Sequence, residues 1–173
     1  MRHVSIVADE WGNHLDPTSY LDALPGFAAD LPPGARAFAT DPGHYDFFGK
    51  RCVKDLKLRS IGFVDGDAEL RFGHSCWKHE EDLTIRYLGL QAIHVDLDGP
   101  QDVILDEILP AAPGCTHEIA CLGGSLTVTC RDLLADWTWA DCPEQRSGGL
   151  GGRGLGEADE RAADAGAEAF RRP

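Results

Sequence analysis

The sequence has no run of about 18 apolar residues, which is the length that a transmembrane helix needs. It has no excess of basic residues either, since 16 Lys and Arg stand against 29 Asp and Glu, for a formal net charge of -13. Asp9 and Glu10 stand where a secretory signal peptide has an apolar stretch. We therefore expect a cytoplasmic protein without membrane association. The acidic balance also excludes a general nucleic-acid binder, because contact with phosphates needs a basic surface.

Several enzyme motifs are also absent. There is no G-x-S-x-G, which excludes the nucleophile elbow of esterases, and no G-x4-G-K-[ST] loop for phosphate. The glycine-rich stretch 148–156 follows no strand pattern and opens no helix pattern, so it is not a nucleotide-binding fingerprint. These absences favour a protein without catalytic activity.

The composition changes near residue 142. Residues 143–173 hold seven of the 20 glycines and only three large apolar residues, Leu150, Leu155 and Phe170. Such a segment buries too little surface to offset the entropy of ordering its backbone, so we expect a disordered tail. Residues 1–142 then form a single domain with 23 acidic and 11 basic residues, a net charge of -12. The acidity belongs to the predicted folded part.

Residues 1–48 read as a helical, loop-rich part. Asp16-Pro17 is a good start for a helix, and Tyr20, Leu24 and Leu31 are among the apolar residues that follow at helical spacing. Pro25 is expected to interrupt this unit. A further helical turn is expected within 35–39, before Asp41-Pro42-Gly43 ends it.

From residue 53 to residue 139 the apolar pattern has a period of two, which is typical of half-buried strands. Asp65-Gly66-Asp67 and Gly123-Gly124 are hairpin signals between such strands. In 83–97 six apolar residues lie at odd-numbered positions, which predicts either two strands or one long bent strand with a break at Gly89; they are Leu83, Ile85, Tyr87, Ile93, Val95 and Leu97.

Residues 103–109 fit a helix as well as a strand, because their apolar pairs lie four residues apart. The fold class that follows is α+β, with short N-terminal helices and an antiparallel β-meander sheet of about five to seven strands.

The six cysteines are expected to be reduced thiols, since a cytoplasmic chain with its own core has little need of disulfides; they are Cys52, Cys76, Cys115, Cys121, Cys130 and Cys142. Cys121 and Cys130 lie on apolar strand faces and read as small core residues. A disulfide between these two is the alternative.

The segment 74–82 is the densest group of chemically versatile side chains. His74, Cys76 and His79 are potential zinc ligands, and Cys115 and His117 could add more from a neighbouring strand. The spacing is irregular for zinc, so a connecting loop with a buried Trp77 is the simpler interpretation. A structural zinc site stays open as the alternative, as does a small Cys/His-dependent enzyme.

The strand half resembles a known group of proteins. The residues that carry the likeness are Val53–Leu58, Glu69–Phe72, Leu83–Leu90, His117–Ile119, Gly123–Cys130 and Trp137. The pattern resembles the small β-rich immunity and uncharacterised domains that accompany bacterial polymorphic toxins. The resemblance implies a cytoplasmic, non-enzymatic protein without a cofactor that binds a partner protein.

A partner of an acidic domain is expected to be basic, because opposite charge speeds encounter. The candidate contact residues are one aromatic residue and the acids of the loops, namely Trp77, Glu80, Glu81, Asp82, Asp65, Asp67, Asp96 and Asp98. The simpler alternative is that these acids only keep the protein soluble. Two hypotheses therefore stand, which are a protein-binding module, such as an immunity-type inhibitor of a basic toxin or enzyme, and a zinc or Cys/His site.

Overall fold

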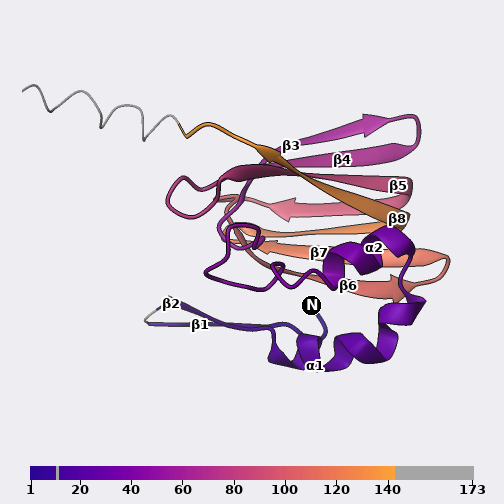
Figure 1. The fold of residues 1–173 in the computed structure, drawn as a ribbon, viewed down its shortest axis with the longest axis horizontal. Helices are drawn as coiled ribbons and strands as arrows, with labels where there is room; N and C mark the ends of the chain where they lie inside the picture. The colour runs from indigo at the N-terminus through magenta and orange to yellow at the C-terminus, as the bar shows by residue number, and fades with distance from the viewer. Residues whose placement is uncertain (11, 143–173) are drawn as a thin grey trace, which may run out of the picture. The chain divides into compact units, whose positions relative to one another are not determined.

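The computed structural model describes residues 1–10 and 12–142 (Figure 1), and the predicted tail, 143–173, lies outside them. The elements, in chain order, are β1 (Ser5–Asp9), β2 (Gly12–Asp16), α1 (Thr18–Phe27), the 3-10 turn η1 (Ala28–Asp30), α2 (Pro33–Ala39), β3 (Lys57–Val64), β4 (Asp67–Gly73), β5 (Glu81–Leu97), β6 (Val103–Ala111), β7 (Gly114–Cys121) and β8 (Gly124–Trp139). This confirms the predicted α+β class. No helix within the described ranges is both long and apolar enough to cross a membrane.

The main sheet has six antiparallel strands in the order β3-β4-β5-β8-β7-β6. It consists of two three-stranded meanders, β3-β4-β5 and β6-β7-β8, which pair through β5 and β8. The strand number lies within the predicted range of five to seven. The ambiguous segment 103–109 is strand, because it pairs with β7 from Val103 opposite Cys121 to Leu109 opposite Thr116 and does not form a helix.

The two halves of the sheet meet at a bend in β5. Strand β5 is one long strand, and Gly89 at its bend has a φ of 58°, in the region that favours glycine. The pairing register with β8 shifts just after it, between Leu90 and Ala92. The predicted break at Gly89 is therefore a bulge that turns the strand without ending it.

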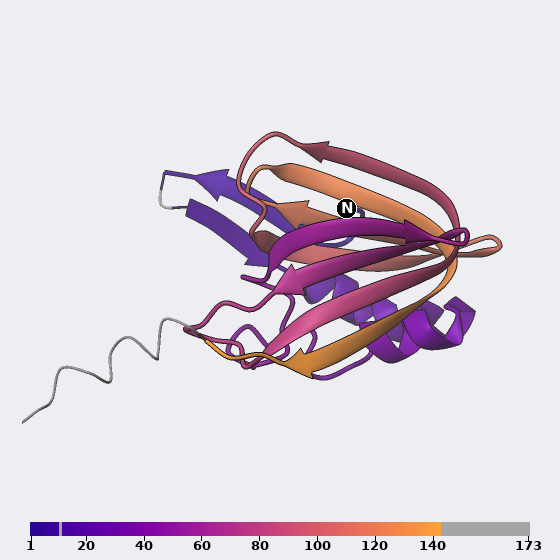
Figure 2. The ribbon, with the colours of Figure 1, turned by 90° about the horizontal axis from the view of Figure 1, so that it is seen from above.

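The curvature brings the two edge strands together at one end of the sheet (Figure 2). The Val103 amide donates to the Leu56 carbonyl at 2.7 Å, and the Leu58 amide donates to the Gln101 carbonyl at 3.1 Å. Hydrogen bonding across this seam removes the open sheet edges there, which would otherwise be sites of aggregation.

The core lies on the inner face of the curved sheet. Alternate residues of β8 (Leu126, Val128 and Cys130) are fully buried, and Leu70 and Ile85 face the same interior from the other meander. Each such side chain contributes roughly 1.5–3 kcal/mol by leaving water. The predicted period of two therefore marks the inner face correctly.

The helical part covers the end of the sheet near β6 and β8 (Figure 1). The interruption predicted at Pro25 is wrong: α1 contains Pro25 and ends two residues later. Pro25 lacks the N–H group that would bond to the Leu21 carbonyl, and the helix ends within one turn after it. The second helical unit is confirmed as α2, whose first amides, on Gly34 and Ala35, donate to the Asp132 carboxylate of β8.

The hairpin β1–β2 was not expected, since residues 1–48 were read as helices and loops. Its five residue pairs run from Ser5 opposite Asp16 to Asp9 opposite Gly12. Among the hairpin side chains that the structure describes, Ile6 and Leu15, which are opposite each other, pack against the core. One apolar pair is too short a pattern to predict a strand from sequence.

Candidate functional site

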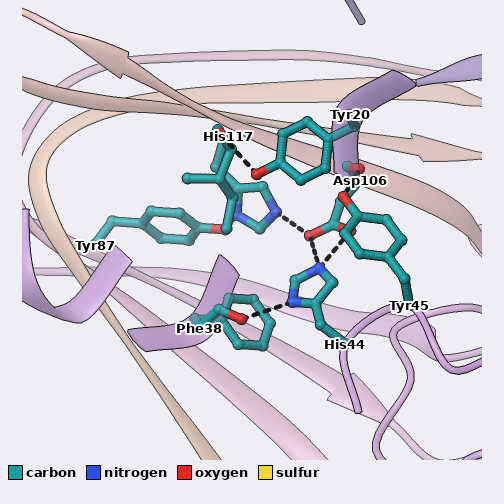
Figure 3. Close-up of polar contacts among 8 residues, drawn as sticks. Tyr20, Phe38, His44, Tyr45, Tyr87, Asp106 and His117 are labelled. Atoms are coloured by element: carbon teal, nitrogen blue, oxygen red, sulfur yellow. Dashed lines mark hydrogen bonds and ion pairs between the residues drawn. The ribbon is translucent and has the colours of Figure 1, made fainter. Parts of the chain in front are cut away.

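A network of charged and polar side chains lies inside the sheet, centred on Asp106 of β6 (Figure 3). His44, from the loop after α2, places its Nε2 atom 2.8 Å from Asp106 Oδ1. His117 of β7 places its Nε2 atom 2.8 Å from Asp106 Oδ2. The Tyr87 hydroxyl lies 2.9 Å from His117 Nδ1. All four side chains are 1% exposed or less.

The hydrogen-bond partners define the protonation states. Both ring nitrogens of His44 face oxygens that only accept, which are the Phe38 carbonyl at 3.0 Å and the Asp106 carboxylate. His44 therefore donates from both nitrogens, as imidazolium. His117 Nε2 donates to Asp106, and its Nδ1 shares a hydrogen bond with the Tyr87 hydroxyl. His44 and Asp106 are therefore a buried cation and anion in contact.

The pKa values agree with this assignment. Burial lowers the pKa of His44, but the charge and hydrogen bond of Asp106 outweigh burial, and the net shift is upward. Burial raises the pKa of Asp106, but His44 and His117 together hold it well below its ordinary value. Burial also raises the pKa of the Tyr87 hydroxyl well above 10, so Tyr87 stays a neutral donor.

The space beside this network is too small for a substrate. A cavity of about 10 Å³ adjoins Asp106 and His117, and its other walls are apolar side chains: Val53, Leu56, Phe72, Leu83, Ile85, Val103 and Ile119. This is about the volume of one water molecule. A His–Asp pair can act as a general base only where a substrate reaches it. The geometry therefore gives this network a structural role.

A second buried carboxylate, Glu107, points to the other face of β6. Its oxygens accept from the backbone amides of Arg2, His3 and Val4 at 2.6–2.8 Å. On the opposite position of β7, Glu118 accepts from the Met1 amino group at 2.6 Å. Strand β6 therefore holds the inner network through Asp106 and the first residues of the chain through the adjacent Glu107.

The predicted zinc ligands are separated by the fold. His74 and Cys76 lie together, with His74 Nε2 3.6 Å from Cys76 Sγ. Cys142 joins them, although it was not among the predicted ligands. Cys76 and Cys142 form a disulfide, so the expectation of reduced thiols is wrong for these two residues in this structure. Their Cα atoms are 5.6 Å apart, a usual distance for a disulfide.

The other three predicted ligands are engaged elsewhere. His79 Nε2 donates to the Cys52 carbonyl at 2.9 Å, and its Nδ1 accepts from the Ser75 amide at 3.1 Å. Burial lowers the pKa of His79, which keeps it neutral in this role. His117 belongs to the buried network described above.

Cys115 faces Cys130 across the strand pair, with sulfurs 3.7 Å apart. The hydrogen bond to Cys130, together with burial, raises the pKa of the Cys115 thiol. The alternative disulfide between Cys121 and Cys130 is wrong, because Cys121 lies opposite Gly124.

The acids of the 74–82 loop are paired within the chain. Glu80 contacts Lys50, and Glu81 accepts two hydrogen bonds from Arg51, at 2.6 and 2.8 Å. Asp82 accepts from the backbone amide of His74 at 2.8 Å and lies 2.7 Å from His74 Nδ1. These contacts hold the loop against residues 50–51.

The remaining predicted contact acids lie elsewhere. Asp65 and Asp67 lie at the β3–β4 turn, so the length of β4, roughly 20 Å, separates them from the 74–82 loop. Asp96 and Asp98 lie at the end of β5, beside the β7–β8 turn. The eight predicted contact residues therefore occupy three separate regions.

Large apolar side chains are exposed where the 74–82 loop meets its neighbours. Phe48 is 98%, Trp77 73% and Trp139 68% exposed, and we call these three residues the tryptophan surface. The simpler interpretation of Trp77 as a buried residue is wrong. The ion pairs of Lys50 and Arg51 join the segment of Phe48 to residues 80–81, and Glu81 pairs with Trp139 in the sheet.

A groove of about 510 Å³ lies beside α1. It is lined mainly by apolar residues and has two carboxylates: Leu21, Leu24, Pro25, Ala28, Ala39, Thr40, Asp41, Pro42, Tyr45 and Asp46. Like the tryptophan surface, this groove is a place where a partner could bury apolar side chains.

Sequence reasoning missed His44, Asp106 and Cys142. A signal for Asp106 was present, because Asp106-Glu107 interrupts an apolar strand pattern, and a carboxylate buried among apolar residues needs a partner. No local pattern identifies His44 as that partner. Cys142 is the last residue before the predicted tail, and nothing in the sequence pattern indicates that it lies beside Cys76.

The comparisons with protein-family models, curated proteins and solved structures found no match to this chain. The fold and the site alone define its class, which is an α+β protein with a curved antiparallel sheet around a sealed His–Asp–His network. The likeness to immunity domains stays a prediction.

Proposed function

We propose that this chain is a non-enzymatic protein-binding domain with a basic protein as its partner, and that the partner binds at the tryptophan surface. The observation that carries the proposal is the exposure of Phe48, Trp77 and Trp139 on segments that are held in place by ion pairs and a disulfide. Trp residues dominate the binding energy of many protein interfaces. A rigid surface with exposed aromatic residues needs little ordering when it binds.

Charge supports a basic partner. The part of the chain from Met1 to Cys142 carries a net charge of -12, so its field attracts basic proteins from beyond contact distance. At the surface itself, Glu80, Glu81 and Asp82 already have partners in the chain. The charge therefore acts mainly on the rate of encounter, and the aromatic side chains supply the contact.

The sealed network supports a role without catalysis, because Asp106 and His117 have no space beside them for a substrate. Inhibition of a basic toxin or enzyme is the specific role we propose, on the resemblance to immunity domains. We place it in the cytoplasm on the same resemblance.

The test begins with the full chain as bait in an extract of the organism that encodes it. Each captured protein is purified and titrated against the chain by calorimetry at low and high salt. A true partner is basic, binds one to one, and binds more weakly as salt rises. Binding to no purified protein with this stoichiometry would contradict the proposal.

Variants then locate the surface. Trp77→Ala and Trp139→Ala should each weaken binding by roughly 30-fold or more, as expected for central interface residues. The matched control is Phe63→Ala, since Phe63 is an exposed aromatic residue near the distant β3–β4 turn. Loss of binding on Leu21→Ala, with both tryptophan variants unaffected, would place the partner in the groove beside α1 instead.

A further inference from the structure

Three potential metal ligands lie where the 74–82 loop meets the end of β8. His74, Cys76 and Cys142 each offer one ligand atom, and these atoms lie within 4.8 Å of one another. The distance from His74 Nε2 to Cys76 Sγ is 3.6 Å. On a tetrahedral zinc ion, with bonds of roughly 2.0 Å to nitrogen and 2.3 Å to sulfur, a nitrogen and a sulfur are about 3.5 Å apart. His74 and Cys76 therefore have the spacing of two ligands of one ion.

Asp82 orients the histidine for this role. Its Oδ1 atom lies 2.7 Å from His74 Nδ1 and also accepts from the His74 backbone amide at 2.8 Å. A proton on Nδ1 that is donated to Asp82 leaves the lone pair on Nε2, which faces Cys76. Histidines that bind metals are commonly held in this way by a carboxylate on the other nitrogen.

The disulfide and a metal ion exclude each other at this place. The sulfurs of Cys76 and Cys142 are bonded to each other, and a disulfide sulfur is not a thiolate ligand. A dithiol reductant supplies two electrons and two protons, which break the S–S bond and give two thiols, while the reductant becomes a disulfide itself. Zinc binding then displaces both thiol protons into solvent.

We propose that His74, Cys76 and Cys142 form a zinc site in the reduced chain, and that the disulfide is the metal-free, oxidised state of the same site. Two thiolates and one imidazole suit zinc, whereas magnesium and calcium take oxygen ligands. Three protein ligands leave one position of a tetrahedral ion for water. This site does not depend on the protein-binding role.

The test uses the full chain, reduced by a phosphine or dithiol reductant and freed of it without oxygen. With added zinc it should retain one zinc ion per chain after gel filtration, measured by elemental analysis. With cobalt instead, it should show thiolate-to-cobalt charge-transfer absorption and the visible bands of a tetrahedral ion. The chain with its disulfide intact should retain no zinc. Equal retention by the oxidised chain would overturn the proposal.

Variants assign the ligands. Cys76→Ser and Cys142→Ser should each abolish the cobalt charge-transfer spectrum of the tetrahedral site, and Asp82→Asn should weaken zinc binding by roughly 10- to 100-fold. His94→Ala, at an exposed position of β5, is the control that should bind as the wild type does. A spectrum that persists in Cys76→Ser and disappears in Cys115→Ser would place the metal at Cys115 and Cys130, and would overturn the proposal. Circular dichroism confirms that each variant is folded.

Discussion

His44 and Asp106 are 62 residues apart in the sequence, and their side chains meet at 2.8 Å inside the protein. The contact joins the loop after α2 to the edge strand β6, and both side chains are almost completely buried. Phe38 packs against the His44 ring, with centroids 4.4 Å apart, and accepts its second hydrogen bond. This ion pair, together with the hydrogen bonds from the Gly34 and Ala35 amides to Asp132, fixes the helical part of the chain on the sheet.

The first prediction concerns removal of the buried anion. Asp106→Asn should lower the free energy of unfolding by about 3–5 kcal/mol, because it leaves the His44 cation buried without a counter-charge. The new amide also has an NH2 group that faces ring N–H donors. Urea denaturation measures the change. Asp96→Asn, at an exposed position, is the control and should stay within about 0.5 kcal/mol of the wild type.

The second prediction concerns pH. The pKa of Asp106 is lowered by folding, so its contribution to stability is complete above about pH 4 and is lost as the pH falls further. The pKa of His44 is raised by folding, so its contribution is complete below about pH 6.5 and is lost as the pH rises through the folded-state value. The pair should therefore stabilise the fold most between about pH 4 and 6.5.

The contribution of His79 to stability has a pH dependence opposite to that of His44 in the same experiment. Its pKa is lowered by folding, mainly by burial, so its contribution is lost as the pH falls below about 6.5. The pH series of denaturation midpoints is therefore best run in His79→Gln, since an amide can keep the hydrogen bonds to Cys52 and Ser75. If Asp106→Asn has the same pH profile as its parent, the assigned role of the ion pair is wrong.

The sheet was predictable because its signals are local. Alternating apolar residues mark the buried face of β8, and Asp65-Gly66 forms the turn between β3 and β4, with both residues at positive φ. Gly89 could be recognised as a special position, but a glycine in a strand pattern does not distinguish a bulge from a break. Residues 103–109 were ambiguous because their register on β7 is set by packing and not by their own periodicity.

The site could not be predicted from the sequence, because it depends on contacts between residues that are far apart in the chain. His44 lies in a loop without a periodic pattern, and only the curvature of the sheet brings Asp106 beneath it. Trp77 was read as buried because tryptophan is mostly buried on average, yet the loop that carries it turns outward. Cys142 meets Cys76 because β8 ends at Trp139, opposite the first residue of β5, and the residues after it run beside the loop that precedes β5.

The third prediction concerns the contact between α2 and β8. A Cβ atom on Gly34 would lie 2.0 Å from the Leu133 carbonyl oxygen, so the backbone of α2 must move away from the strand to admit a methyl group. Gly34→Ala should destabilise the fold by about 1–3 kcal/mol. The control is Gly26→Ala in α1, where a Cβ atom meets nothing within 4 Å. That variant should be stabilised by roughly 0.4–1 kcal/mol, because alanine restricts the unfolded chain. Equal midpoints in thermal denaturation would contradict the tight contact.

The last prediction links the disulfide to zinc through stability. The bond between Cys76 and Cys142 closes a loop with a sequence separation of 66 residues, so its reduction in the presence of a chelator should cost up to about 4 kcal/mol of unfolding free energy. Zinc at about 100 times its dissociation constant should restore roughly 2.7 kcal/mol, since only the folded chain brings His74 to both thiolates. The variant Cys76→Ser can form neither the disulfide nor the zinc site, so neither reduction nor zinc should change its urea midpoint. If zinc leaves the midpoint of the reduced wild type unchanged, the closure of this loop depends on the disulfide alone.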